Sequence, residues 1–499
     1  MSTNREKWTK NSMNRRSLLK GAVALGLAAC AGEGMAEEQQ DKVKAAPAPA
    51  KPEPAGDSYE EPAKRLPARR FDVVVAGGGT AGVMAAIAAA RQGAKTVLIE
   101  SKGYTGGIIT EGGTALHSFF NVWKPYPGVK KTQLVKGIPH EIIERLTRMG
   151  GTSGHAELSK GYAHDSVCLA VDVELYKLLS HTMLHEAGVY VCLNTLLAGV
   201  ITEGKRIKGV IAESRSGREA FFASAFIDCT GYGDLAAHAG AGYSEPNDFP
   251  LCNSMGVANV DVESLCKNLQ IVQYAEGLRS GKEGKIVRFK GGNKDFDLRL
   301  ATTTVHDNYL MFVKADVGGD WGTSKTWRVT DRDEMAKYEL EARKLQQELI
   351  AKIRKVPGCE TAFSARSSPV LNIRRGRVIK CDYDISASDV LGGRHFDDDV
   401  MAYGFQDQEK PIGGGGGSFG IPYRALCAAE IENLLVAGMM ITSAFVAHHS
   451  TRNTVSCMAQ GQAVGTAAAL CAAKTCMTRD LKYPELKKAL LDGGVYLKS

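Results

Sequence analysis

Apolar and polar positions are most regularly patterned in residues 71–100. An apolar run at 71–76 is followed by glycines and by an alanine-rich stretch from Ala81 to about Gln92, and a second apolar run at 95–99 ends at Glu100. Short apolar runs bounded by glycine are typical of buried parallel strands. Alanine-rich stretches favour helices, and their small side chains allow close packing on a sheet. The pattern therefore predicts a strand, a tight turn, a helix and a second parallel strand.

The turn after the first predicted strand contains Gly77, Gly79 and Gly82, which have the spacing G-x-G-x-x-G. The first glycine permits the tight turn, the second lets backbone approach a pyrophosphate, and the third lets the helix pack on the strand. Thr80 and Ala81 lie at the amino end of the predicted helix, where N–H groups and the helix dipole face the phosphates. These residues predict a dinucleotide site.

Glu100 stands at the carboxyl end of the second predicted strand. An acid at this place accepts the hydrogens of a ribose diol and favours an unphosphorylated ribose. The unit therefore predicts FAD or NAD rather than NADP, and by itself it leaves the choice between FAD and NAD open.

Two later segments repeat the order of apolar strand and glycine, at 225–228 and at 434–437. After the first of them, Thr230 and Gly231 are expected to turn sharply under a nucleotide. A helix rich in small residues is expected to open near Met458–Gly461 and to continue to about 473. Three such segments, far apart in the chain, predict one dinucleotide-binding fold that is closed by the C-terminal part.

The predicted fold class is therefore α/β, with a discontinuous Rossmann-like domain formed by residues 69–245 and 411–480. Residues 246–410 form an inserted mixed α+β cap domain, and 481–499 form a C-terminal tail. Within the insert, we expect an amphipathic helix at 332–355 and strands near 309–315 and 370–373.

The first 36 residues resemble a twin-arginine (Tat) export signal, because Arg15-Arg16 precedes a short apolar run. Export of the already folded protein would suit a cofactor loaded in the cytoplasm. Residues 27–30 resemble a lipobox, which would make Cys30 a lipid anchor at the cell envelope, and cleavage after Ala36 is the alternative. Met13 is an alternative start. Residues 37–68 are rich in Ala and Pro and predict a linker.

Composition narrows the class of protein further. The chain is 44% hydrophobic with a net charge of +7, and its basic residues do not cluster with aromatics, so nucleic-acid binding is not expected. No apolar run reaches the roughly 18 residues that span a bilayer. The twelve cysteines form no C-x-x-C pair, and His181 and His185 lack the glutamate of H-E-x-x-H, so no metal site is expected.

The strand–glycine segments, together with GYTGG at 103–107 and GIPYRAL at 420–426, resemble the FAD-dependent oxidoreductase family whose fold is shared with the fumarate reductase and succinate dehydrogenase flavoproteins. The resemblance covers about residues 70–475 and implies that the cofactor is FAD. It implies that Thr230, Gly231 and Asp234 border the diphosphate and that Gly438 faces the ribityl region. It also implies that Gly106 and Gly107 lie near the ribityl chain or flavin ring, and that a helix start at Gln462 and Ala463 points its dipole at the flavin. It does not specify the substrate.

Catalytic candidates come from the segment between the last strand and the last helix. His448, His449 and Arg452 lie there, and Arg424 lies in GIPYRAL. An arginine facing a flavin can hold a carboxylate or polarise a carbonyl, and a histidine can carry the accompanying proton. The five glycines of 413–417 form either a flexible hairpin tip or a close approach to substrate or flavin, of which we favour the second.

The sequence therefore predicts an exported FAD enzyme that transfers a hydride to or from a small organic substrate. No second glycine fingerprint and no haem or iron–sulfur motif is present, so a separate electron carrier or a second substrate is expected. A flavin-bearing electron-transfer lipoprotein and a monooxygenase remain as alternatives.

Overall fold

The computed structural model describes residues 58–114, 116–121, 129–152, 154–155, 168–269, 288–319, 327–406, 412–442 and 444–498. Its chain divides into two units, residues 1–63 and 64–499. In the first unit only residues 58–63 are described, and they are exposed irregular chain. The predicted export signal and most of the predicted linker therefore lie outside the described residues.

A five-stranded parallel sheet forms the centre of the second unit. Its order is β20-β10-β2-β3-β6, and its strands are β2 (Val73–Ala76), β3 (Thr96–Ile99), β6 (Tyr190–Cys192), β10 (Ala225–Asp228) and β20 (Leu434–Val436). All residues of the inner strands β2, β3, β10 and β20 are buried, as their continuous apolar runs require. Strand β20 comes from the C-terminal part of the chain, so the predicted α/β, Rossmann-like fold closed from the far end is confirmed.

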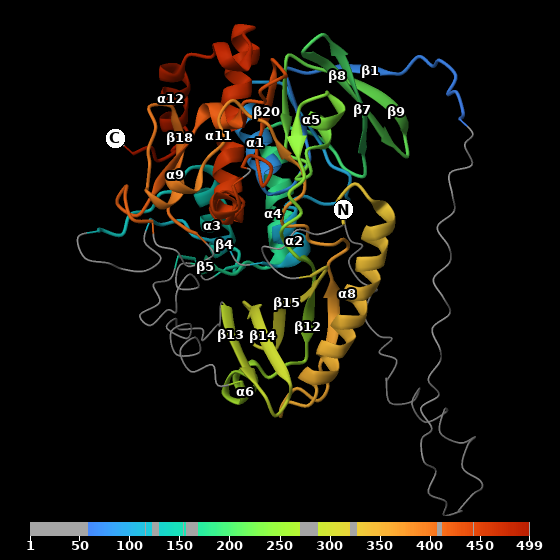
Figure 1. The fold of residues 1–499 in the computed structure, drawn as a ribbon, viewed down its shortest axis with the longest axis vertical. Coiled ribbons are helices and arrows are strands. Elements are labelled where there is room, and N and C mark those ends of the chain that lie inside the picture. The colour runs from blue at the N-terminus through green and yellow to red at the C-terminus, as the bar shows by residue number, and fades with distance from the viewer. Residues whose placement is uncertain are drawn as a thin grey trace, which may run out of the picture. The chain divides into compact units, whose positions relative to one another are not determined.

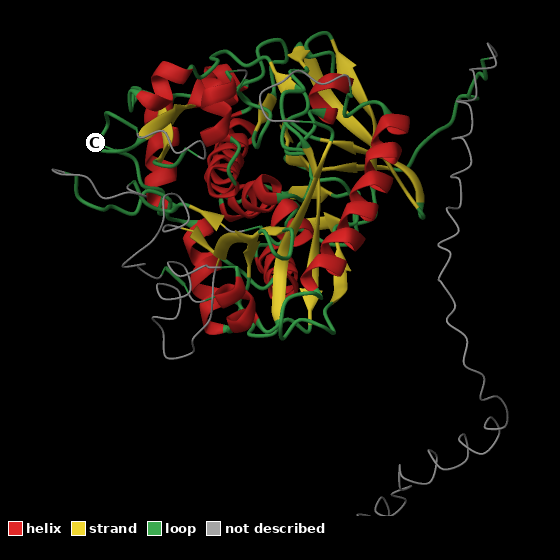
Figure 2. Ribbon diagram, turned by 60° about the horizontal axis from the view of Figure 1, so that its bottom comes forward, coloured by secondary structure: helices red, strands yellow, loops and turns green. Residues whose placement is uncertain are grey.

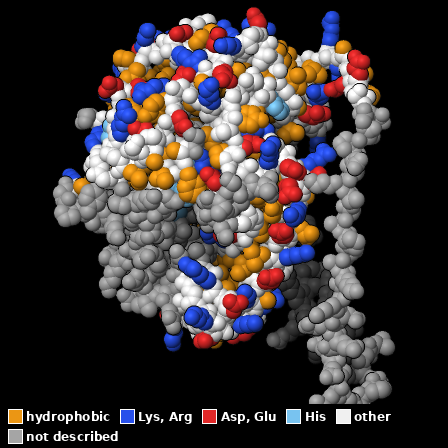
Figure 3. All heavy atoms as spheres, in the orientation of Figure 1, with side chains coloured by type: hydrophobic (Ala, Val, Ile, Leu, Met, Phe, Trp, Pro, Cys, Tyr) orange, Lys and Arg blue, Asp and Glu red, His pale blue; other side chains and the backbone are white. Residues whose placement is uncertain are grey.

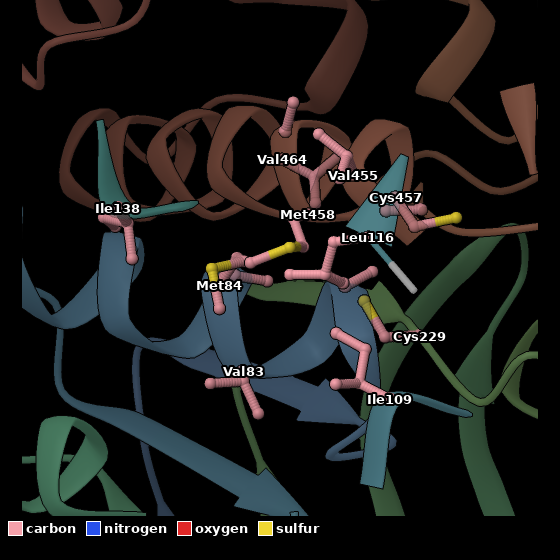
Figure 4. Close-up of a cluster of buried hydrophobic side chains, with 14 of the residues drawn as sticks. Val83, Met84, Ile109, Leu116, Ile138, Cys229, Val455, Cys457, Met458 and Val464 are labelled. Atoms are coloured by element: carbon pink, nitrogen blue, oxygen red, sulfur yellow. The ribbon is translucent and has the colours of Figure 1, made fainter. Parts of the chain in front are cut away.

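Two helices of small residues pack on each other beside this sheet (Figure 1), namely α1 (Thr80–Arg91) and α11 (Thr454–Lys474). A Cβ atom on Gly461 would lie 2.8 Å from the carbonyl carbon of Ala81, and one on Gly465 equally close to that of Ala85. Only glycine permits this approach. Figure 4 shows the thioethers of Met84 and Met458 meeting in the interface.

Helix α11 begins at Thr454, so the expected helix start near Met458–Gly461 is wrong. The glycines that suggested a helix start lie in the middle of the helix, where they serve contact with α1.

An antiparallel sheet of strands β7 (Leu196–Glu203), β8 (Arg206–Ser214) and β9 (Gly217–Phe222) follows β6, and β1 (Ala68–Arg70) joins β9 in parallel. The strand before it, β6, belongs to the parallel sheet and not to this one.

The inserted part contains a second sheet covered by a long helix. Both lie in the lower half of Figure 1, and in Figure 2 the long helix runs along the right side of the strands. Its elements are β12 (Leu251–Ala258), α6 (Val262–Asn268), the hairpin β13 (Arg288–Asn293) and β14 (Leu298–Thr303), β15 (Tyr309–Val317), α8 (Arg332–Ile353) and β16 (Phe363–Ser367). The sheet order is β15-β12-β16. The expected helix and the strand near 309–315 are present.

The expected strand at 370–373 is wrong. Only Asn372 makes a bridge there, to Cys252. Pro369, which has no N–H group, precedes the segment, and the segment faces a cavity described below.

The remaining elements are short and connect these layers: α2 (Ile108–Gly112), β4 (Leu116–His117), α3 (Ile138–Arg148), β5 (Cys168–Leu169), α4 (Val173–Glu186), α5 (Asp234–His238), β11 (Tyr243–Ser244), β17 (Val378–Ile379), α9 (Ala387–Leu391), β18 (Asp399–Tyr403), β19 (Phe419–Pro422), η2 (Tyr423–Leu426), α10 (Phe445–Thr451), η3 (Thr478–Asp480) and α12 (Tyr483–Asp492). Strand β18 pairs with β19 across the domain boundary predicted at 410. Within the described ranges, no helix combines the length and apolarity needed to cross a membrane.

Candidate functional site

Three glycine turns converge at the carboxyl edge of the parallel sheet. Gly77 has φ +92°, and a Cβ atom there would lie 2.6 Å from the carbonyl carbon of Cys229 in the turn after β10. A Cβ atom on Gly107 would lie 2.9 Å from Cα of Gly79, so the loop before α2 touches the first turn as well. The hydroxyl of Thr80 donates to the Gly106 carbonyl at 3.2 Å. Because these turns contact each other through glycine backbone, these glycines put no side chain into the place where a pyrophosphate binds in Rossmann-like folds.

Glu100 is buried at the end of β3, and its carboxylate is held by backbone. Oε2 accepts from the Gly78 N–H at 2.7 Å, and Oε1 accepts from the Lys102 N–H at 2.8 Å. The carboxylate is therefore fixed beside the glycine turn, with lone pairs left for ribose hydroxyls. The glycine cradle and this acid together fit the adenosine half of FAD.

The turn after β10 is organised by Asp228. Its carboxylate accepts from the N–H groups of Thr230 at 3.0 Å and Ala236 at 2.8 Å, and from the Thr230 hydroxyl. Complete burial raises the pKa of Asp228 in spite of these bonds. Asp234, in the same turn, pairs with Arg377 at 2.8 Å.

One cavity of about 1280 Å³ extends from these turns into the inserted part of the chain. Pockets for drug-sized ligands measure roughly 300–1,000 Å³, so this one has room for a dinucleotide. The expected cofactor residues that line it are Gly77, Gly79, Thr80, Ala81, Glu100, Gly107, Thr230, Gly231, Asp234 and Gly438. Gly82 and Gly106 do not line it. Gly82 instead packs on the Gly77 carbonyl, as expected for the third glycine of the motif.

The inserted part supplies the other wall of the same cavity. This wall contains apolar side chains, among them Phe312, Met335, Leu371 and Ile373, together with the charged residues Lys314, Glu339 and Arg374. Arg374 pairs with Asp316 at 2.8 Å, and Lys314 lies 3.6 Å from the same carboxylate. Burial alone would raise the pKa of Asp316, but Arg374 and Lys314 outweigh it and hold this pKa below its usual value.

Helix α11 begins at the cavity, where Asn453 and Thr454 line the wall. The N-terminal dipole of the helix therefore points into the cavity from Thr454. Gln462 and Ala463, which we expected there, lie more than two turns further on. The Gln462 amide instead bonds the N–H of Ile138 and the carbonyl of Gly493, each at 2.9 Å.

Gln460, which sequence reasoning missed, fixes the turn after β20. Its Oε1 accepts from the Gly438 N–H at 2.8 Å, and its Nε2 donates to the Thr451 carbonyl at 2.8 Å. Only the fold shows this role, because the residue is separated from Gly438 by a loop and a helix.

The two candidate histidines are buried outside the cavity wall. His448 is fully buried, and its Nε2–H donates to the Arg374 carbonyl at 3.1 Å. Burial, together with Arg375 and Arg452, holds the pKa of His448 well below its usual value. The rings of both histidines pack on Phe249, at centroid distances of 5.3 Å for His448 and 4.8 Å for His449. They sit behind the residues that face the cavity.

Of the two candidate arginines, only Arg452 lines the cavity. Its guanidinium lies 5.0 Å from the centre of the Phe249 ring. Arg424 is ion-paired with Asp398 and lies over the rings of Tyr383 and Phe396, and it is not part of the cavity wall. Of the four catalytic candidates, the structure thus places Arg452 on the cavity wall and the other three away from it.

The glycines of 413–417 also lie away from the cavity wall. Gly414 and Gly415 pack against the backbone of Gly393, where a Cβ atom would overlap them. The run permits a close contact between two chain segments, so the expected approach to substrate or flavin is wrong.

His117 is the histidine that the described wall of the cavity contains. Its ring stacks on Phe405 at 5.1 Å and 19°, and its carbonyl accepts from the Tyr403 hydroxyl at 2.5 Å. It follows the GG of the loop 103–113, a position that could have marked it in the sequence.

Side chains of the inserted part fix the end of α2, which borders the cavity. Three cap side chains donate to three successive carbonyls at the end of α2: Arg366 to Glu111 at 2.6 Å, Ser254 to Gly112 at 3.0 Å and Thr303 to Gly113 at 2.9 Å. The last carbonyls of a helix lack partners within it, so these side chains satisfy what the helix leaves open. Glu111, which faces the cavity, is ion-paired with Lys102.

Fold and site together define a flavin-dependent oxidoreductase. The sequence profile of the family described as "FAD dependent oxidoreductase" matches residues 72–490, and the chain belongs to this family. Its cofactor is FAD, and the residues above fit the adenosine and diphosphate parts of FAD.

Among curated proteins, 3-oxosteroid 1-dehydrogenase of Mycolicibacterium smegmatis is 37% identical to this chain over 89 residues. The matched stretch makes up 18% of this chain and 15% of that protein. The match thus spans a small part of the relative's length.

Two solved structures illustrate the likeness at the level of the whole chain. A geranylgeranyl bacteriochlorophyll reductase-like protein from Thermoplasma acidophilum is 14% identical, with a TM-score of 0.43 over 85% of this chain and 83% of that one. A myxobacterial chondrochloren halogenase is 12% identical, with a TM-score of 0.44 over 84% and 78%. Neither value supports an argument about activity.

Proposed function

We propose that this protein is an exported oxidoreductase that transfers a hydride between FAD and a small organic substrate held against the inserted part of the chain. The observation that carries the proposal is the single cavity whose wall includes both Glu100 and Gly77 on one side and Phe312 and Leu371 on the other. A cofactor and a substrate can meet in one such space without a further conformational step.

When bound, FAD supplies the two-electron chemistry, and the chain supplies binding, orientation and charge. The glycine turns and Glu100 hold the adenosine and diphosphate. The amino end of α11 provides a positive dipole where Asn453 and Thr454 face the cavity, which suits negative charge on a reduced ring.

Among the four catalytic candidates, Arg452 is the one that can contact a substrate directly, because it lines the cavity. We add His117 as the group that exchanges a proton with the substrate. His448 acts through another residue: by donating to the Arg374 carbonyl, it positions a segment whose guanidinium faces the cavity.

The wall of the inserted part favours a substrate with an apolar body and at least one polar group. Phe312, Met335 and Leu371 offer apolar surface, while Lys314 and Arg374 supply donors at the same wall. A pocket of this kind argues against a protein that only relays electrons, because such a protein needs no site for an organic substrate.

Electrons leave or arrive through a separate carrier or a second substrate. The twin-arginine stretch supports export after cofactor loading, and Cys30 supports a lipid anchor at the cell envelope. Both features lie outside the described residues. Cell fractionation of Cys30→Ser against the wild type tests the anchor: release from the membrane fraction is expected, and unchanged membrane association would contradict it.

An anaerobic screen tests the activity. The purified full chain is mixed with panels of enoates, polyols, amines and keto acids, both oxidised and photoreduced, and the flavin absorbance is followed. Bleaching or recovery with one class is expected. A protein whose flavin changes only with oxygen would contradict hydride transfer to an organic substrate.

A further inference from the structure

Helix α11 ends in a Schellman motif that brings two cysteines together. Thr475 follows the helix with φ +52° and ψ +38°, and its N–H donates to the Ala472 carbonyl at 3.2 Å. The Cys476 N–H then donates to the Cys471 carbonyl at 3.1 Å. This pair of bonds defines the motif, and the side chains at the positions of Cys471 and Cys476 are the pair that such a motif frequently brings into contact.

The two thiols share a largely apolar environment. Cys471 is 2% exposed, and Cys476 is partly buried against the same core. Burial raises the pKa of the Cys471 thiol, and the neighbouring Cys476 thiol raises it further. Contact between the two sulfur-bearing side chains is thus indicated both by the backbone geometry and by the effect of Cys476 on the pKa of Cys471.

The residue between them makes this corner unusual. Thr475 is β-branched, and β-branched residues are strongly disfavoured at positive φ. The corner is therefore held by what packs on each side of it. After Cys476, the hydroxyl of Thr478 donates to the Glu432 carbonyl at 3.0 Å, and the Tyr423 hydroxyl donates to the Thr478 carbonyl at 2.9 Å.

We propose that Cys471 and Cys476 form a disulfide when the folded protein meets an oxidising compartment. Two S–H bonds break and one S–S bond forms. Two electrons and two protons pass to a disulfide-bearing oxidant, which is reduced to two thiols. The bond would fix the end of α11, whose other end lines the cavity. The disulfide is independent of the proposed flavin chemistry, and it rests on the proposed export, which would bring the protein into an oxidising compartment.

Another partner for Cys471 would be Cys427, which lies in its neighbourhood. The Cys427 thiol, however, donates to the Tyr423 carbonyl at 3.6 Å within its own segment, whereas the Cys471 thiol donates to the carbonyl of Met477, the residue after Cys476, at 3.9 Å. Cys476 instead follows Cys471 within one closed turn of backbone, so the pairing needs no rearrangement of a distant segment.

The test uses the purified full chain, reduced and then equilibrated with oxidised glutathione. Free thiols are blocked, and the protein is digested with trypsin, which cuts after Lys474 and so separates the two cysteines. The expected product is a link between peptides 453–474 and 475–479, which fragmentation places on Cys471 rather than Cys457. Cys476→Ala should abolish the link. Cys192→Ala, a partly buried cysteine on the parallel sheet, is the matched control and should keep it.

Thermal unfolding provides a second measurement on the same samples. Oxidation should raise the Tm of the wild type and of Cys192→Ala, but not that of Cys476→Ala. The pairing is overturned by full alkylation of both cysteines after oxidation, by a glutathione adduct on Cys476, or by a link from Cys471 to Cys427. An equal rise in the Tm of Cys476→Ala would overturn the stabilising role.

Discussion

The two walls of the cavity differ in how their residues are arranged along the chain. On the FAD side, each contact comes from a short segment in which strand, glycine turn and helix follow one another, as at 73–91. On the cap side, the wall combines residues from β12, β15, α8 and the segment 369–374, which lie far apart in the sequence. On the face shown in Figure 3, acidic and basic side chains are interspersed over both parts.

This difference has a physical origin. A dinucleotide is recognised largely by backbone N–H groups and one acid, so the requirement is local and constrains the sequence strongly. A small organic substrate is recognised by side chains that only tertiary packing brings together. The FAD side is therefore built to one pattern, whereas the cap side can vary with the substrate.

The largest expected effect is on the glycine cradle. In Gly77→Ala the new methyl group would meet the backbone of Cys229, which cannot move away. FAD binding should fall by more than about 100-fold, and the purified protein should be colourless. Gly93→Ala is the matched control, because Gly93 also has positive φ (+89°) but has open space around it. It should lose only about 1–2 kcal/mol of stability and keep FAD. Equal flavin content in the two variants would refute the cradle.

His117 tests the chemistry at the junction of the two walls. His117→Ala should retain FAD and lose about 10²–10⁴-fold in the rate of flavin reduction by a substrate identified in the screen, since a positioned proton donor contributes that much. The control is His181→Ala on the exposed face of α4, which should be unchanged. If His117→Ala keeps its rate while His448→Ala loses it, the proton-transfer role belongs to the buried pair.

Arg366 tests whether the cap side supports the FAD side. Arg366→Met removes the donors that join the Glu111 carbonyl, at the loop that borders the cavity, to the Met311 carbonyl in β15. A hydrogen bond from a charged group contributes about 1.5–3 kcal/mol, so FAD affinity should weaken by roughly tenfold or more. Arg354→Met is the control, since it loses a comparable bond to the Ala362 carbonyl inside the cap. Equal FAD dissociation constants for both variants would show that the two walls act independently.

The smallest effect is a pH dependence of stability. His448 is neutral in the folded protein because its pKa is depressed, whereas in the unfolded chain it takes up a proton near its ordinary pKa of about 6.5. Its contribution is therefore fully present above about pH 6.5 and decreases as the pH falls below that value, by at most about 1.4 kcal/mol per pH unit.

His448→Gln keeps a donor for the Arg374 carbonyl and cannot be charged. Urea unfolding of this variant between pH 7 and pH 5 should therefore show a shallower loss than that of the wild type. Identical slopes would mean that His448 does not supply the dependence.

The FAD side could be predicted from the sequence almost residue by residue. Glu100, Thr230 and Gly438 line the cavity as expected, because each follows a strand whose end position is set by local pattern. The error at α11 also has a local cause. The expected start near Met458–Gly461 lies inside the helix, where Gly461, like Gly465, permits close contact between α11 and α1, a tertiary feature that a single segment does not reveal.

The proposed catalytic residues were less predictable, since burial decides which polar side chains reach the cavity. Arg452 and His449 are three residues apart, yet only the arginine is on the wall. His117 was missed because the contact between its strand β4 and α11 is tertiary, and its place after Gly112-Gly113 was the one local signal.

The most direct test of the shared cavity is a crystal structure of the full chain with FAD bound. The account predicts an isoalloxazine ring at the start of α11, beside Thr454 and His117, with its free face open to Phe312 and Leu371. A ring sealed from these cap residues by protein, or bound outside this cavity, would contradict it.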